Sequence, residues 1–150
     1  MRECDAEAMA GVYRRSVRSL GARDYTPEQV EAWAGRGPDA ARFRQKIADG
    51  RKGWVAVDAE GRVCGFVDLE ADGHIDFLYV DPDRAGQGGA GRLLAEVEQA
   101  ARSEGLTRLY VEASETARRV FERHGYTVVR RRDFEIGDVA IHNYAMARRL

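Results

Sequence analysis

The spacing of apolar side chains predicts helices in the first third of the chain. Between Asp5 and Leu20 apolar residues recur at helical spacing, and arginines occupy the opposite face. Thr26-Pro27-Glu28-Gln29 has the residues of a helix start, because Thr26 can cap the helix and Gln29 can reach back to it. A further short helix is predicted from about Asp39 to Ala48, ending at Gly50.

From Trp54 onward the apolar period changes from helical to alternating. Three β-prone runs, Trp54–Val57, Val63–Leu69 and His74–Val80, are joined by turns that contain glycine. They predict an antiparallel meander with one continuous third strand from His74 to Val80.

The remaining chain alternates helices with strands. A helix after a glycine-rich loop ends at Gly105, and Leu106–Ala113 should form a strand parallel to the preceding one by the right-handed crossover rule. Another short helix precedes two closing strands, near Tyr126–Phe134 and Val139–Met146. The sequence therefore predicts one α/β (α+β) domain over residues 1–150 with a mixed, mostly antiparallel central sheet.

The glycine-rich loop carries the first sign of function. It lies in the segment IDFLYVDPDRAGQGGAGRLL, residues 75–94, where Gly86, Gly88, Gly89 and Gly91 fall within six positions before a helix. The first N–H groups of a helix have no partner within it, and the helix dipole adds positive charge there. Such a loop is typical of a site for a phosphate group of a cofactor.

Two cofactor classes compete for this loop. Gly86, Gly88 and Gly91 fit the dinucleotide pattern G-x-G-x-x-G, and Glu112 stands where such a fold keeps its ribose-binding acid. Against that reading, DPDRA separates Val80 from the first glycine, and the preceding elements are hairpins. The segment V-D-P-x-x-x-G-x-G-x-A/G-x-x-L-L instead resembles motif A of the GNAT acyl-CoA N-acyltransferases.

The GNAT resemblance has one departure in the loop and one downstream. The family pattern Q/R-x-x-G-x-G/A falls on residues 85–90, where Ala85 replaces Gln or Arg and Arg84 is its neighbour. SETARRVFERHGY is similar to the family's N-x-x-A-x-x-F-Y-E-x-x-G-F, with Phe121 in place of the tyrosine that protonates the leaving thiolate. YVEASETAR and the closing IHNY most resemble a subgroup of largely uncharacterised bacterial acetyltransferases.

The resemblance implies the GNAT fold, with about six to seven strands, and acetyl-CoA as co-substrate. The family's first strand would be short or missing, since only Arg2–Cys4 precede the first helix. The expected cofactor-binding residues are those of the third strand's end, the loop and the second motif: Leu78, Tyr79, Val80, Gly86, Gln87, Gly88, Gly89, Ala90, Gly91, Ser114, Ala117 and Phe121.

Transfer of an acetyl group to an amine needs a base for the amine and an acid for the thiolate. On an alternating strand His74 and Asp76 share one face, at positions where relatives carry a catalytic glutamate. We predict His74 as base with Asp76 orienting it, and Tyr144 as acid. The alternatives are a His74 that only bonds the Asp72-Gly73 turn and a Tyr144 that only packs in the core. By resemblance, Tyr25 and Trp33 would line the acceptor side.

The composition of the chain limits the classes of binding partner that we expect. With 24 basic and 25 acidic residues the net charge is −1, so no nucleic-acid partner is expected. No stretch approaches the roughly 20 apolar residues of a membrane span. Cys4 and Cys64 match no disulfide or metal spacing, so we expect a cytoplasmic protein without a metal. The expected acceptor is a primary amine on a small molecule or a peptide, and we also consider a homodimer. An acyl-CoA-binding module without turnover is the alternative function, which the phenylalanine at 121 favours.

Overall fold

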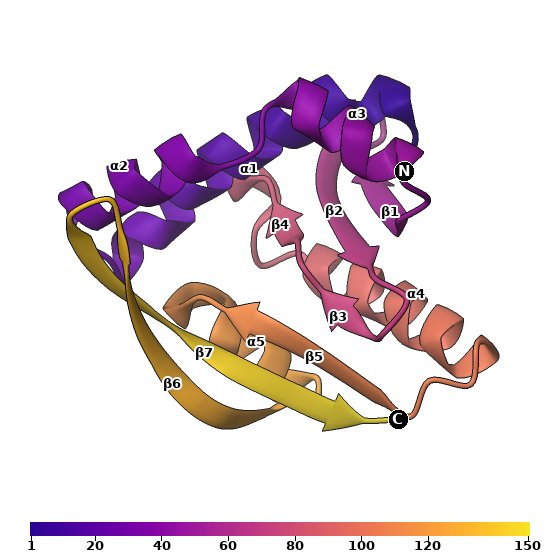
Figure 1. Ribbon diagram of the computed structural model, residues 1–150. Coiled ribbons are helices and arrows are strands. Elements are labelled where there is room, and N and C mark those ends of the chain that lie inside the picture. Colours follow the sequence, from indigo (N-terminus) through magenta and orange to yellow (C-terminus); the bar gives the residue numbers. More distant parts are fainter.

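The computed structural model describes residues 1–150, and its helices cover a sheet that is divided in two (Figure 1). The helices are α1 (Ala6–Leu20), α2 (Pro27–Arg36), α3 (Ala40–Ala48), α4 (Gly89–Ser103) and α5 (Glu115–Arg123). The strands are β1 (Lys52–Val57), β2 (Val63–Leu69), β3 (His74–Ile75), β4 (Leu78–Val80), β5 (Arg108–Ala113), β6 (Thr127–Ile136) and β7 (Val139–Arg149). The predicted fold class is confirmed, and the order of helices and strands agrees with the prediction except that β3 and β4 stand in place of one third strand.

Local sequence signals account for the ends of the N-terminal helices. Thr26 Oγ1 accepts from the Gln29 backbone N–H at 3.2 Å, and Gln29 Oε1 accepts from the Thr26 N–H at 3.0 Å. This reciprocal pair satisfies two backbone donors at the start of α2. No strand precedes α1, because Glu3–Asp5 form a single 3₁₀ turn. Residues 1–5 therefore contribute no strand to either sheet.

The strands form a three-stranded sheet of order β1-β2-β4 and a four-stranded sheet of order β3-β5-β7-β6. All neighbours are antiparallel except β3 and β5, which are parallel as the crossover rule predicts. Strand β6 is an edge strand, and three successive arginines, residues 130–132, lie along it. Charged side chains on an edge oppose pairing with another chain.

The prediction of one continuous strand from His74 to Val80 is wrong, and a buried side chain is the reason. Asp68 Oδ1 accepts from the backbone N–H groups of both Asp76, at 3.0 Å, and Phe77, at 2.7 Å. Asp68 is 1% exposed, and its carboxylate accepts these two N–H groups in place of a main-chain carbonyl, while its own N–H still donates to the Phe77 carbonyl at 3.2 Å. The chain leaves one sheet and enters the other, and the alternation that put His74 and Asp76 on one face does not continue.

Two hydrophobic clusters fill the space on either side of the strands. One lies against α4 and α5 and includes Leu94, Val97, Phe121 and Met146. The other lies against α1–α3 and includes Val12, Phe43, Phe66 and Ile141. None of the helices combines the length and the apolar character required to cross a membrane.

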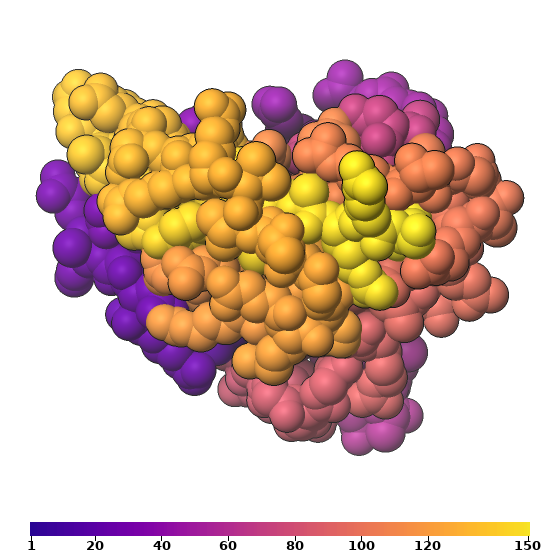
Figure 2. Space-filling view, turned by 90° about the horizontal axis from the view of Figure 1, so that it is seen from below, coloured from indigo at the N-terminus to yellow at the C-terminus, as the bar shows by residue number.

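The hairpin of β6 and β7 reaches across to the N-terminal helices. Gln29 of α2 donates from Nε2 to the Ala140 carbonyl at the hairpin end, over 2.9 Å. Figure 2 shows these C-terminal strands, orange to yellow, spread over the middle of one face, with indigo and purple N-terminal residues at its margin. The hairpin thereby closes one side of a hollow between the two sheets.

Candidate active site

Two hollows adjoin where the sheets part. The glycine groove, with a volume of about 720 Å³, runs along β4, the glycine loop and the facing sides of α4 and α5. The aromatic pocket, of about 110 Å³, lies between α2, the β6–β7 hairpin and β5. Both are lined by Trp33, Leu78, Tyr79, Ser114 and Ala117. A ligand in the groove can therefore present one end to the pocket.

The glycine loop shapes the end of the groove at α4. Gly88 is the N-cap residue of this helix and has φ +77°, a conformation that L side chains avoid. No side chain caps the helix, so the first N–H groups of α4 are available to a ligand. This arrangement favours an anion at the helix start.

Three arginines that line the groove add to this positive charge: Arg84, Arg92 and Arg123. A guanidinium group can bind a phosphate through two parallel N–H···O hydrogen bonds, which makes the contact strong. Sequence reasoning noticed Arg84 only as a neighbour of Ala85 and missed the other two, since nothing but the packing of α4 and α5 directs them to one groove. The groove thus has the charge required by a ligand with several phosphates.

Most of the predicted cofactor residues line the glycine groove, with two exceptions. Leu78, Tyr79, Val80, Gly86, Gly88, Gly89, Ala90, Gly91, Ser114 and Ala117 are among its lining residues. Gln87 is exposed and donates from Nε2 to the Asp83 carbonyl at 3.3 Å. Phe121 is 1% exposed, packs edge-on against Tyr126 and lines the aromatic pocket instead. A contact of either side chain with the cofactor stays a prediction.

Strand β4 has a free edge toward the groove. Leu78, Tyr79 and Val80 pair with Val67, Phe66 and Gly65 of β2, and no strand pairs with β4 on its other side. Backbone N–H and C=O groups require hydrogen-bond partners. The open edge can therefore bind an extended ligand that carries amide groups, in the manner of an added strand.

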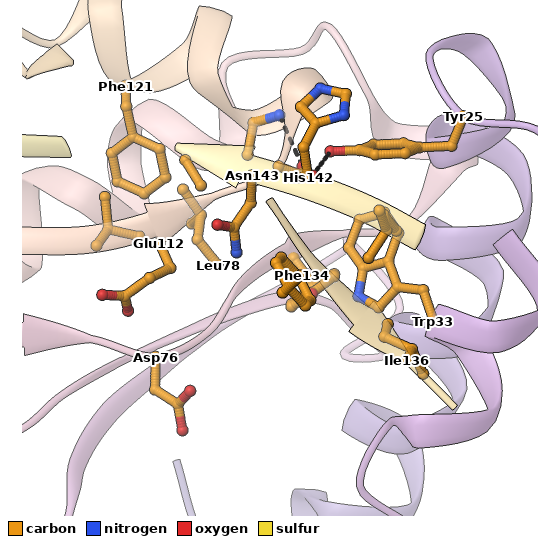
Figure 3. A pocket seen from close by; sticks show the side chains of 16 residues that line it. Tyr25, Trp33, Asp76, Leu78, Glu112, Phe121, Phe134, Ile136, His142 and Asn143 are labelled. Atoms are coloured by element: carbon orange, nitrogen blue, oxygen red, sulfur yellow. Dashed lines mark hydrogen bonds between the residues drawn. The ribbon is translucent and has the colours of Figure 1, made fainter. Parts of the chain in front are cut away.

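Aromatic and carboxylate side chains line different parts of the pocket (Figure 3). Tyr25 and Trp33 come from the N-terminal helical region and Phe134 from β6, whereas Asp76 and Glu112 present their carboxylates at another part of the rim. Tyr25 and Trp33 both line this pocket, and their place on the acceptor side stays a prediction.

Tyr25 also fixes the start of α5 against β7. Its hydroxyl donates to the His142 carbonyl at 2.9 Å and accepts from the Glu115 backbone N–H at 2.8 Å. Burial raises the pKa of Tyr25 to about 12, so it stays protonated. The Tyr25 hydroxyl therefore joins β7 to the start of α5 at the wall of the pocket.

Asp76 does not make the predicted contact with His74. Its carboxylate binds Lys46 Nζ at 3.0 Å and Arg51 Nη1 at 2.7 Å. Burial acts to raise the pKa of Asp76, but the bonds to the two cations outweigh burial and hold that pKa below its usual value. Asp76 is thus an ion-paired carboxylate at the pocket rim.

His74 is held by two glutamates. Its Nε2 lies 2.6 Å from Glu112 Oε2, and its Nδ1 lies 3.3 Å from Glu70 Oε2. The ring stacks on Tyr110. Burial acts to lower the pKa of His74, but the two carboxylates outweigh burial and raise it. His74 does not itself line the aromatic pocket, whereas Glu112 does.

The hydroxyl and the ring of Tyr144 contact side chains of α5. Its hydroxyl donates to Glu115 Oε2 at 2.7 Å, and the Arg118 guanidinium lies 4.6 Å from the ring centre. The bond to Glu115 raises the pKa of Tyr144. The Tyr144 side chain lines neither the glycine groove nor the aromatic pocket, so it does not face a ligand bound in either of them. The core-tyrosine alternative describes this geometry.

Comparisons with known proteins agree on one family. Residues 21–148 match the family model described as an acetyltransferase (GNAT) domain. The uncharacterised N-acetyltransferase YafP of Escherichia coli K12 is 31% identical over 142 residues, which cover 95% of this chain and 88% of that protein. An uncharacterised N-acetyltransferase of Mycobacterium tuberculosis is 25% identical and covers 97% and 98% of the two chains.

Solved structures share the fold. A GNAT-family N-acetyltransferase from Rhodopseudomonas palustris has 34% identity and a TM-score of 0.87, covering 97% of this chain and 90% of that one. The PaiA N-acetyltransferase of Thermoplasma acidophilum, crystallised with coenzyme A, has 18% identity and a TM-score of 0.78, covering 100% and 96%. The glycine loop, the arginines and the open edge of β4 fit this ligand. The chain therefore belongs to the GNAT acetyltransferase family and is an N-acetyltransferase whose co-substrate is acetyl-CoA.

Proposed function

We propose that the protein acetylates a primary amine on a compact, largely apolar molecule that binds in the aromatic pocket. The observation that carries this proposal is Asn143 Oδ1, a buried acceptor in that pocket with no hydrogen-bond partner. An unpartnered buried acceptor costs about 1–3 kcal/mol. With a turn of the Asn143 side chain toward the pocket, an amine N–H from the acceptor would supply the missing donor.

The pocket walls favour an apolar body behind that amine. Eleven of the sixteen lining residues are hydrophobic, and they include Trp33, Phe134 and Ile136. Aromatic faces also attract a cationic amine. Figure 3 shows Asn143 between these rings and the Glu112 carboxylate, a position suited to the amine end of such a molecule.

Shared residues support a direct transfer between two bound substrates. Acetyl-CoA in the glycine groove would place its thioester near Leu78 and Ser114, which also line the pocket. The amine would attack the thioester carbon while both substrates are bound, and proximity would then provide much of the acceleration.

The cytoplasmic location remains part of this proposal, and the two unpaired cysteines, Cys4 and Cys64, support it.

A panel of amines tests the proposal. The protein and acetyl-CoA are incubated with an arylalkylamine, a polyamine, an aminoglycoside and a peptide with a free amino terminus. Released thiol is followed by absorbance and acetylated product by mass spectrometry. We expect the largest kcat/KM for the arylalkylamine, and Asn143→Ala should raise its KM while leaving CoA affinity unchanged. A preference for the polyamine or the aminoglycoside would contradict the proposed acceptor class.

A further inference from the structure

Glu112 is the pocket carboxylate whose contacts leave it suited to receive a proton. It stands on β5, and its side chain is 35% exposed at the rim of the aromatic pocket. Its Oε2 lies 2.6 Å from His74 Nε2, and the only nearby guanidinium, that of Arg132, is 3.8 Å from its Oε1. Glu112 therefore keeps an oxygen that the acceptor amine can reach.

The other ionisable groups of the pocket differ from Glu112 in their partners or in their place. Asp76 is bound by Lys46 and Arg51 at 3.0 Å and 2.7 Å, and two cations stabilise its charged form. His142 points its Nε2 to Glu115 Oε2 at 2.9 Å. Figure 3 shows the ring of His142 on the opposite side of β7 from the Glu112 and Asp76 carboxylates. Asp76 is therefore held by two permanent cations and His142 faces away, whereas Glu112 has no lysine or arginine within hydrogen-bond distance.

A chain of contacts behind Glu112 fixes its direction. His74 bonds Glu112 through Nε2 and Glu70 through Nδ1, and Glu70 in turn binds Arg51. The His74 ring stacks on Tyr110, with ring centres 4.8 Å apart, and its backbone N–H donates to Asp72. With its side chain 17% exposed, His74 has little freedom to turn away.

We propose that Glu112 is the general base of the acetyl transfer and that His74 is its positioning residue. This inference rests on the proposed function above and assigns roles that differ from those predicted from the sequence. The amine nitrogen forms a bond to the acetyl carbon, the carbon–sulfur bond breaks, and the electron pair leaves with the sulfur of CoA. The proton lost by the amine nitrogen goes to Glu112 and then to water at the exposed rim.

The test uses Glu112→Gln in the full chain, with the amine that the wild type acetylates fastest. The amide keeps the shape and can still accept a hydrogen bond, but it cannot take the proton. We expect kcat to fall by roughly 10² to 10⁴, with CoA affinity unchanged. Glu104→Gln, which removes a carboxylate at the far end of α4, is the matched control and should retain wild-type turnover.

His74→Gln separates positioning from mere packing. A glutamine amide can still donate to Glu112 but carries no charge, so the variant keeps the hydrogen bond and removes the positive charge beside the proposed base. The acidic limb of the kcat/KM profile should therefore move to higher pH, while Glu112→Gln should remove that limb. The charged groups that face this pair are Glu70, Asp72, Asp76, Arg132 and, through Glu70, Arg51. All five remain in both variants.

Three outcomes decide between the proposals. An active wild type with an equally active Glu112→Gln would overturn the role of Glu112 alone. Loss of turnover in Asp76→Asn, with Glu112→Gln intact, would transfer the role of base to Asp76. A wild type that acetylates no amine of the panel, although acetyl-CoA stabilises it, would contradict the proposed acceptor class and this inference with it.

Discussion

Gly91 of α4 lies directly against the imidazole of His124, so that a Cβ at position 91 would be 2.9 Å from both Cε1 and Nε2 of that ring. Both residues line the glycine groove. Gly91→Ala should therefore displace the ring and weaken CoA binding several-fold. Its effect on stability should be small, because alanine gains about 0.5–1 kcal/mol over glycine in a helix. Titration calorimetry and urea unfolding measure the two effects.

The control for that variant is Gly35→Ala in α2, where a new Cβ has no neighbour within 4 Å. It should stabilise the protein by about 0.5–1 kcal/mol and leave CoA binding unchanged. Equal CoA affinity in the two variants would contradict the importance of the contact between Gly91 and His124.

A second pair of glycines separates backbone strain from ligand approach. Gly88 at the start of α4 and Gly105 just beyond its end have φ of +77° and +75°, and neither has a neighbour within 4 Å of a new Cβ. Alanine at either position should cost about 1–2 kcal/mol of stability. Only Gly88→Ala should reduce the rise in melting temperature that CoA produces by binding the native state. A similar reduction in Gly105→Ala would mean that strain alone acts.

Tyr25 and Tyr144 should differ in the stability of their phenylalanine variants. Tyr25→Phe leaves the Glu115 N–H and the His142 carbonyl without their partner, which should cost about 1–3 kcal/mol. Tyr144→Phe removes one donor from Glu115, which keeps His142 and Arg118, so we expect a loss of about 0.5–1.5 kcal/mol. Urea unfolding measures both. A fall in turnover of more than about tenfold in Tyr144→Phe would restore Tyr144 as the acid.

The pKa of His74 can be read from its ring protons by NMR, since the chain has only three histidines. In the wild type it should lie above the usual value of about 6.5, because Glu112 and Glu70 stabilise the imidazolium. Glu112→Gln should lower it. The stability that this pairing contributes should be fully present below pH ~6.5 and be lost as pH rises through the raised pKa. A pKa unchanged by Glu112→Gln would mean that the two side chains do not interact in solution.

Elements whose causes are local could be predicted from the sequence. The start of α2 depends on Thr26 and Gln29, three residues apart, and the glycine loop depends on residues within one short segment. The break after Ile75 could not be predicted, because its cause is the side chain of Asp68 on another strand. A period of two read along residues 74–80 contains no trace of that bond.

The same distinction applies to the site. Ten of the twelve cofactor-binding residues expected from the sequence line one groove in the structure, because motif and loop are continuous in the chain. Glu112 and Asn143 were not identified as site residues, since each lies in a strand whose neighbours are set by the two-sheet topology. In the sequence Glu112 matches only the dinucleotide pattern, which the fold excludes.

The break at Asp76 and Phe77 also bears on how the molecule opens. Because the strands form two ladders instead of one, either sheet can lose its hydrogen bonds while the other keeps its own, and local opening of this kind is read by amide hydrogen exchange. The glycine groove is lined from both sides of the division, by Val80 of β4 and by Ser114 after β5. Bound CoA should therefore slow amide exchange in both sheets together and make two cooperative units behave as one.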